Sequence, residues 1–157
     1  SILFAQLEKL HELIHLPANF DDAFWIKFFS LETSLGLKKK LCKQTLPHWI
    51  VGDSEWMVVR LLRIPPIEKL LSIVTGPIST TSLNLTGERP ITTYDQAATF
   101  VTQAKSEVLL WGEQGTRLSG ESSTMVFLEE DGSFQIKRQG RKYLEVMALF
   151  KTVSHAR

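Results

Sequence analysis

GPISTTSLNLTG, residues Gly76–Gly87, is the stretch that decides the fold of this chain. Eight of the eleven residues after the first glycine are hydroxylated, amide, glycine or proline types, which contact anions well and pack cores poorly. Ile78–Thr81 is short and β-prone, and Ser82 and Asn84, two residues apart in an extended chain, share a face. Gly87 allows the backbone to approach a ligand closely. We expect a loop that holds an anionic ligand; the alternative is a surface turn rich in Ser, Thr and Asn.

This loop also resembles a known signature, and three further blocks follow the same family in order. Thr81–Gly87 is similar to the Thr-Ser-Ala-Asn-x-Ser-Gly motif of the Sua5/YrdC/YciO family, threonylcarbamoyl-adenylate synthases of tRNA modification. Val58–Pro65 resembles the strand ending in Arg-x-Pro that precedes the motif by a helix. Ser123–Val126 resembles its Ser-Thr-Val-Val strand, and Ile136–Gly140 its Ile-x-Arg-Pro-Gly hairpin end. The resemblance covers Leu35–Leu149.

The sequence departs from the family pattern in several places. Family members begin with a Pro-Thr-x-Thr-Val-Tyr-Gly-Leu strand and a Lys-x-Arg pair that holds nucleotide phosphates, and neither is in this sequence. We therefore expect residues 1–157 to form a single, partial YrdC-like domain, incomplete at its N-terminus. The departures also include the family's Pro-Gly-Pro-Leu-Thr element, its signature alanine, two prolines and an aspartate, which are replaced here by Ser30–Ser34, Leu83, Ser122, Gln139 and Phe127.

Composition sets the class of protein. With 157 residues, 43% of them apolar, the chain is long enough for one hydrophobic core. The net charge of +1, from 18 basic and 17 acidic side chains, gives no overall field toward nucleic acid or an anionic membrane. The single cysteine, Cys42, forms no internal disulfide. No apolar run reaches the roughly 18 residues of a membrane span. We expect a cytoplasmic protein without membrane contact.

The periodicity of apolar residues predicts helices interleaved with strands. An amphipathic helix is expected over residues 3–16, and a second helix follows the capping residues Asp21 and Asp22 with an aromatic face that we assign to the core. Further helices are expected from Pro65 through Val74, over Tyr94–Lys105 after a Thr93 cap, and over Lys142–Val153. Strands are expected over Thr33–Leu37, Trp56–Leu62, Glu107–Trp111, Ser123–Leu128 and Ser133–Arg138, the last two as a hairpin. This order predicts an α/β (α+β) fold, which the resemblance specifies as a YrdC-like twisted mixed sheet with flanking helices.

His11–His15 spells His-Glu-x-x-His, the pattern of zinc proteases. On a helix the two imidazoles would share a face, with Glu12 between them. A catalytic zinc also needs a third protein ligand and a substrate-binding strand upstream. Only ten residues precede His11, and no further ligand stands out downstream. We interpret both histidines as ordinary groups at the border of an apolar stripe, and expect no metal site and no zinc.

Four lysines lie close together in the sequence, between the first and second predicted strands. They are a candidate RNA contact, since each phosphate contact adds salt-dependent affinity, and the alternative is a solvated face. These residues are Lys38, Lys39, Lys40 and Lys43.

The family resemblance implies a nucleotidyltransferase reaction and a set of ligands. The substrates would be ATP, with Mg, L-threonine and bicarbonate. The product, threonylcarbamoyl-adenylate, would reach tRNA directly or through a separate transferase. By matching motifs, Thr81, Ser82, Asn84 and Arg138 would bind the nucleotide, and Arg63 and Ser123 the threonine carboxylate or carbamate. Arginine suits these oxyanions through its paired donors. The alternative function is an inactive nucleotide- or RNA-binding YrdC-like module or fragment, favoured by the missing Lys-x-Arg pair.

Overall fold

A computed structural model describes residues 1–74, 78–104 and 109–154 of the chain. These residues form two compact units. The first unit comprises Ser1–Thr80 and Ser122–Arg157, and the second comprises Thr81–Glu121.

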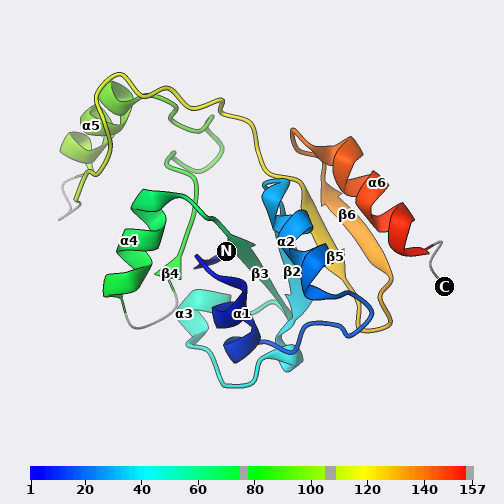
Figure 1. The fold of residues 1–157 in the computed structure, drawn as a ribbon. Coiled ribbons are helices and arrows are strands. Elements are labelled where there is room, and N and C mark those ends of the chain that lie inside the picture. Colours follow the sequence, from blue (N-terminus) through cyan, green and yellow to red (C-terminus); the bar gives the residue numbers. More distant parts are fainter. Residues whose placement is uncertain (75–77, 105–108, 155–157) are drawn as a thin grey trace. The chain divides into compact units, whose positions relative to one another are not determined.

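The first unit is built on a six-stranded mixed sheet with the order β4-β1-β3-β2-β5-β6 (Figure 1). β1 is parallel to β3, and β2 is parallel to β5, whereas the other three pairs are antiparallel. This mixed sheet with flanking helices confirms the predicted α/β fold class. The strands are β1 Ile2–Phe4, β2 Ser34–Lys38, β3 Trp56–Leu61, β4 Ile78–Ser79, β5 Met125–Leu128 and β6 Phe134–Arg138.

Helices cover one face of this sheet, which we call the helix-covered face. Buried side chains of α1, α2 and α6 form one cluster with alternate residues of the strands, such as Leu35, Val59 and Val126. Within the described ranges, each helix is too short or too polar to cross a lipid bilayer. The helical segments of this unit are α1 Leu7–Leu13, α2 Asp22–Ser30, η1 Lys39–Leu41 (a 3₁₀ turn), α3 His48–Val51, α4 Pro65–Ile73 and α6 Tyr143–Ser154.

The α2 helix supplies the aromatic part of the core, as predicted. The Asp21 carboxylate accepts a hydrogen bond from the Phe24 amide at 2.8 Å, and this N-cap fixes the start of the helix. Phe24, Trp25, Phe28 and Phe29 are all buried, and the rings of Trp25 and Phe28 meet edge to face.

The amino-terminal segment differs from the predicted helix over residues 3–16. Residues Ile2–Phe4 form β1, which lies between β3 and β4, and α1 begins only at Leu7. The helix prediction was wrong here because three consecutive apolar residues fit a buried strand as well as a helix turn, and pairing with β3 decides the outcome. At the other end, α1 stops at Leu13, and Ile14 forms a bridge with Cys42.

Most other elements of the first unit lie within about two residues of their predicted ends. The strands β2 and β3, the β5–β6 hairpin and the helices α4 and α6 are confirmed.

In the second unit, the predicted strand Glu107–Trp111 lies partly outside the described residues. Leu109–Trp111 are described and are not in a strand.

The second unit contains one helix and extended loops. Thr93 caps α5, Tyr94–Gln103, by accepting a hydrogen bond from the Gln96 amide at 3.3 Å, which confirms the predicted cap. The Leu118 amide donates to the Thr92 carbonyl at 2.8 Å and holds the later loop against the start of the helix. None of the described residues of this unit is buried.

Candidate anion-binding site

The segment before β5 is clamped by the segment that follows β6. Gly140 packs directly on this backbone, because a Cβ there would lie 2.3 Å from both the Ser122 carbonyl oxygen and the Thr124 nitrogen. Its amide also donates to the Thr124 hydroxyl at 3.2 Å. Only glycine fits this position, so the position of Ser123 in the first unit is tightly fixed.

Arg138, from the end of β6, holds the same segment through its guanidinium group. Its Nε donates to the Ser123 carbonyl and its terminal nitrogen to the Ser123 hydroxyl, both at 3.0 Å. The Ser123 hydroxyl also lies 2.8 Å from that of Ser34, the first residue of β2. The structure thus brings together two of the predicted site residues and adds Ser34.

Arg60 is a functional candidate that the sequence analysis missed. Burial lowers the pKa of its guanidinium group, and the nearby positive charge of Arg138 lowers this pKa further. Its Nε is buried and has no hydrogen-bond partner among the described residues. A buried donor without a partner is costly, and two repelling guanidinium groups are stabilised by a shared anion. We call Ser34, Arg60, Ser123 and Arg138 the arginine–serine cluster.

The strand register explains why the cluster forms where neighbouring strands end. Arg60 follows Val59, which pairs with Leu35, and Ser34 precedes Leu35 on the antiparallel neighbour. Ser34 in turn pairs with Met125, two residues after Ser123. The carboxyl end of β3 and the amino ends of β2 and β5 therefore lie side by side.

Glu32 is an acidic group near the cluster. Its negative charge raises the pKa of Arg60, against the larger lowering effects, and its carboxylate lies 3.8 Å from the Lys142 ammonium group. Glu32 thus lies near Arg60 and Lys142, and Arg138 lies near Arg60, so these four groups together carry a net positive charge. A site of this charge favours a carboxylate, carbamate or phosphate.

Arg63, the other arginine singled out in the sequence, lies in different surroundings. It lines a cavity of about 390 Å³ together with residues of α1, α2 and β3. The other lining residues are Gln6, Leu7, Glu8, Ile26 and Leu61, and none belongs to the arginine–serine cluster. A role for Arg63 in binding threonine stays a prediction.

In the second unit, Ser82 and Asn84 meet, as their spacing predicts, but they bond to each other. The Ser82 hydroxyl donates to the Asn84 side-chain oxygen. The Asn84 amide nitrogen donates to the carbonyls of Leu85 at 2.8 Å and Glu88 at 3.1 Å. Gly87 has a φ of +88°, as the turn requires. The signature loop is thus ordered by its own polar side chains, and the role of Thr81 stays a prediction.

The four lysines of the candidate RNA contact have partners within the protein. Lys38 pairs with Glu55 at 2.7 Å and Lys40 with Glu130 at 2.6 Å. Lys39 and Lys43 donate to the carbonyls of Gly52 and His11. These contacts are all within the protein, and both direct RNA contact and the solvated-face alternative stay predictions.

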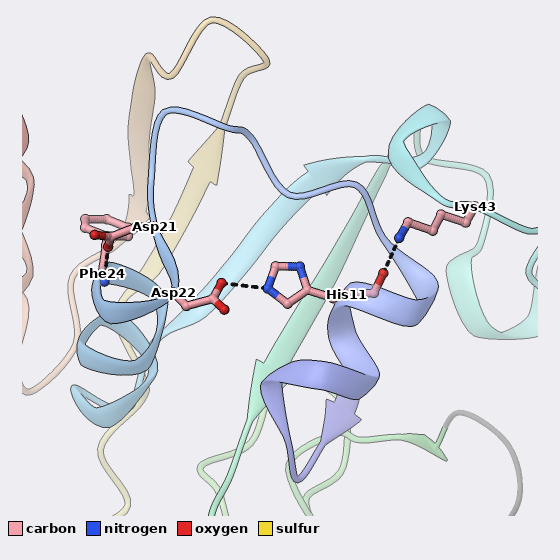
Figure 2. A network of polar contacts seen from close by, with 5 residues as sticks. All are labelled: His11, Asp21, Asp22, Phe24 and Lys43. Carbon is pink, nitrogen blue, oxygen red and sulfur yellow. Dashed lines mark hydrogen bonds and ion pairs between the residues drawn. The ribbon is translucent and has the colours of Figure 1, made fainter.

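The His-Glu-x-x-His segment does not place both histidines on one helix. Figure 2 shows the His11 imidazole bonded to the Asp22 carboxylate, at 2.9 Å, while the His11 carbonyl accepts from Lys43. His15 lies beyond the end of α1, where its amide donates to the Leu41 carbonyl at 2.8 Å. The expected shared face was therefore wrong. Among the described residues, no three His, Cys, Asp or Glu side chains are grouped to hold a metal ion.

The fold and the cluster define a mixed-sheet domain with a candidate anion-binding site where neighbouring strands end. The family model for Sua5/YciO/YrdC, described as "Telomere recombination", matches residues 1–140. The chain belongs to this family.

Curated relatives match over a shorter part of the chain. The threonylcarbamoyl-AMP synthase of Wigglesworthia glossinidia brevipalpis is 40% identical over 48 residues, 31% of this chain and 25% of that protein. The enzyme of the same name from Haemophilus influenzae is 35% identical over 54 residues, 34% of this chain and 30% of that protein. The match thus spans less than a third of the length of each relative.

Two solved structures share the fold. The crystal structure of P. abyssi Sua5 complexed with L-threonine has a TM-score of 0.67 at 20% identity, covering 88% of this chain and 39% of that one. E. coli YciO has a TM-score of 0.65 at 15% identity, covering 92% of this chain and 67% of that one.

Proposed function

We propose that this chain acts in threonylcarbamoyl-AMP synthesis, the reaction that supplies tRNA threonylcarbamoyladenosine modification. The observation that carries the proposal is the arginine–serine cluster, in which a buried Arg60 donor has no partner among the described residues. Family membership and relatives named threonylcarbamoyl-AMP synthase support the same reaction.

The proposed substrates are ATP, L-threonine and bicarbonate. Threonine and bicarbonate give a carbamate with loss of water. A carbamate oxygen then forms a bond to the α-phosphorus of ATP, the bond from that phosphorus to the bridging oxygen breaks, and pyrophosphate leaves. The protein has little covalent work in such a transfer, since its task is to hold two anions in line and to neutralise their charge. Mg bound with ATP would supply further positive charge.

Each member of the cluster has a role in this proposal. Arg60 and Ser123 bind the threonine carboxylate or the carbamate, while Arg138 orients Ser123 and faces the nucleotide. Binding of the nucleotide by Thr81, Ser82 and Asn84 of the second unit stays a separate prediction from the family resemblance. The product passes to tRNA through a separate transferase, in the cytoplasm.

Threonine affinity tests this assignment against the one derived from the sequence alone. Arg60→Gln removes a charge-assisted hydrogen bond of about 1.5–3 kcal/mol, so we expect threonine to bind at least about tenfold more weakly. Calorimetry on the whole chain gives the affinity. Arg63→Gln is the comparison, and Lys69→Gln, an exposed cation on α4, is the control. A loss with Arg63→Gln but not with Arg60→Gln would contradict the role of Arg60.

Pyrophosphate release separates the enzyme from a binding module. Threonine-dependent release of pyrophosphate from ATP supports the synthase. Binding of ATP and threonine without release supports the alternative, a YrdC-like module that holds the ligands without turnover. Failure of the wild-type chain to bind either ligand would contradict both.

A further inference from the structure

Two aromatic rings meet on the sheet face opposite the helix-covered one. Trp56 of β3 and Phe127 of β5 have ring centroids 4.6 Å apart with an interplanar angle of 37°. Their strands are separated by β2, and the rings approach each other near Gly36, because a Cβ there would lie 2.3 Å from the Phe127 ring. Both rings are half-exposed. We call Trp56 and Phe127 the aromatic pair.

Cations flank the aromatic pair. The Lys38 ammonium group lies 4.1 Å from the centroid of the Trp56 ring, and that of Lys137 lies 5.5 Å from the centroid of the Phe127 ring. Lys38 also pairs with Glu55. Positive charge beside half-exposed rings is unsuited to an apolar protein partner. It suits a ligand that combines a π-system with negative charge, such as a nucleotide.

The aromatic pair and the arginine–serine cluster share one face of the sheet. Trp56 and Arg60 are four residues apart on β3, an even number, so their side chains lie on the same face. Four residues at about 3.3 Å each place them roughly 13 Å apart. An extended nucleoside triphosphate reaches over a comparable distance from its base to its phosphates.

We propose that the aromatic pair stacks the purine base of the nucleotide whose phosphates lie at the arginine–serine cluster. This inference rests on the proposed function, because it names where the ATP of that reaction places its base. The ammonium groups of Lys38 and Lys137 lie beside the rings and favour a ligand of negative charge over a cationic one.

Paired ligands test the inference on the whole chain. ATP and inorganic tripolyphosphate share the phosphates but differ in the base. We expect ATP to bind the wild type at least about tenfold more tightly than tripolyphosphate, because base stacking adds to phosphate binding. Trp56→Leu and Phe127→Leu should each weaken ATP binding toward the tripolyphosphate value and leave tripolyphosphate affinity unchanged. Trp49→Leu, which changes an exposed tryptophan of α3, should alter neither affinity.

Each other outcome overturns the inference in a distinguishable way. Equal affinity of the wild type for ATP and tripolyphosphate removes the base site but leaves the proposed function intact. Unchanged ATP affinity in both leucine variants, with unfolding curves like that of the wild type, has the same meaning. If the leucine variants bind an oligoadenylate RNA more weakly than the wild type does, but bind ATP equally well, the aromatic pair is assigned to RNA instead. Absence of binding of both phosphate ligands to the wild type removes the inference and the proposed function together.

Discussion

The two faces of the sheet in the first unit use alternate residues of the same strands for opposite purposes. On the helix-covered face, Leu35, Val59 and Val126 are 0% exposed and belong to the core. On the other face, Arg60 and Phe127 are half-exposed and lie near polar or charged partners. Because side chains alternate along a strand, one sequence segment contributes to stability on one side and to binding on the other.

The largest expected effect is on the helix-covered face. Phe28→Ala removes a fully buried ring of α2, so we expect a loss of about 3–5 kcal/mol in the free energy of unfolding. Phe127→Leu on the other face should cost less than about 1.5 kcal/mol, since the ring is half-exposed and the change keeps an apolar side chain. Urea unfolding measures both values. Equal losses of unfolding free energy in the two variants would show that both faces contribute alike to stability.

Gly36 tests how tightly the aromatic pair is packed. Gly36→Ala places a Cβ 2.3 Å from the Phe127 ring, and we expect a cost of about 1–3 kcal/mol from overpacking. In a Phe127→Ala background this clash disappears, so the same change should cost much less. The double-mutant cycle isolates the coupling between the two residues. Additive losses would mean that the ring moves aside freely, and the aromatic pair would then lack a fixed geometry.

The sequence predicted most strands of this sheet but did not single out Arg60 of the candidate site. Trp56–Leu62 was expected as a strand from its β-prone apolar run, and β3 indeed alternates between half-exposed and buried residues. Arg63 was selected by motif matching, whereas Arg60 lies in the cluster because it falls on the opposite face from Val59. The signal available in the sequence was the alternation of side chains along a strand. Arg60 lies within β3 on the face opposite Val59, whereas Arg63 lies beyond the end of β3.

Other misses have a tertiary cause. The strand Ile2–Phe4 depends on β3 and β4 as neighbours, and no local pattern distinguishes three apolar residues in a strand from those in a helix. The facing of Ser82 and Asn84 was predictable from their spacing. The hydrogen bond from the Ser82 hydroxyl to the Asn84 side-chain oxygen forms in the turn around Gly87, and their spacing alone does not predict it.

A smaller effect is expected at the start of α2, where two adjacent carboxylates have different partners (Figure 2). Asp21→Ala removes the cap on the Phe24 amide and should cost about 1 kcal/mol, because a helix donor loses its acceptor. Thermal unfolding followed by circular dichroism measures this loss. Asp21→Asn keeps a capping oxygen and should restore most of the stability.

Asp22 provides the matched control and the smallest expected change. Its carboxylate bonds to His11 of α1, but the Asp22 and His11 side chains are 69% and 39% exposed. A pair so open to solvent contributes about 0–1 kcal/mol, so Asp22→Asn should cost less than Asp21→Ala. A larger loss at Asp22 would mean that the link between α1 and α2, and not the helix cap, holds the helix-covered face in place. In that case the stability of this face would depend on an exposed hydrogen bond between two side chains.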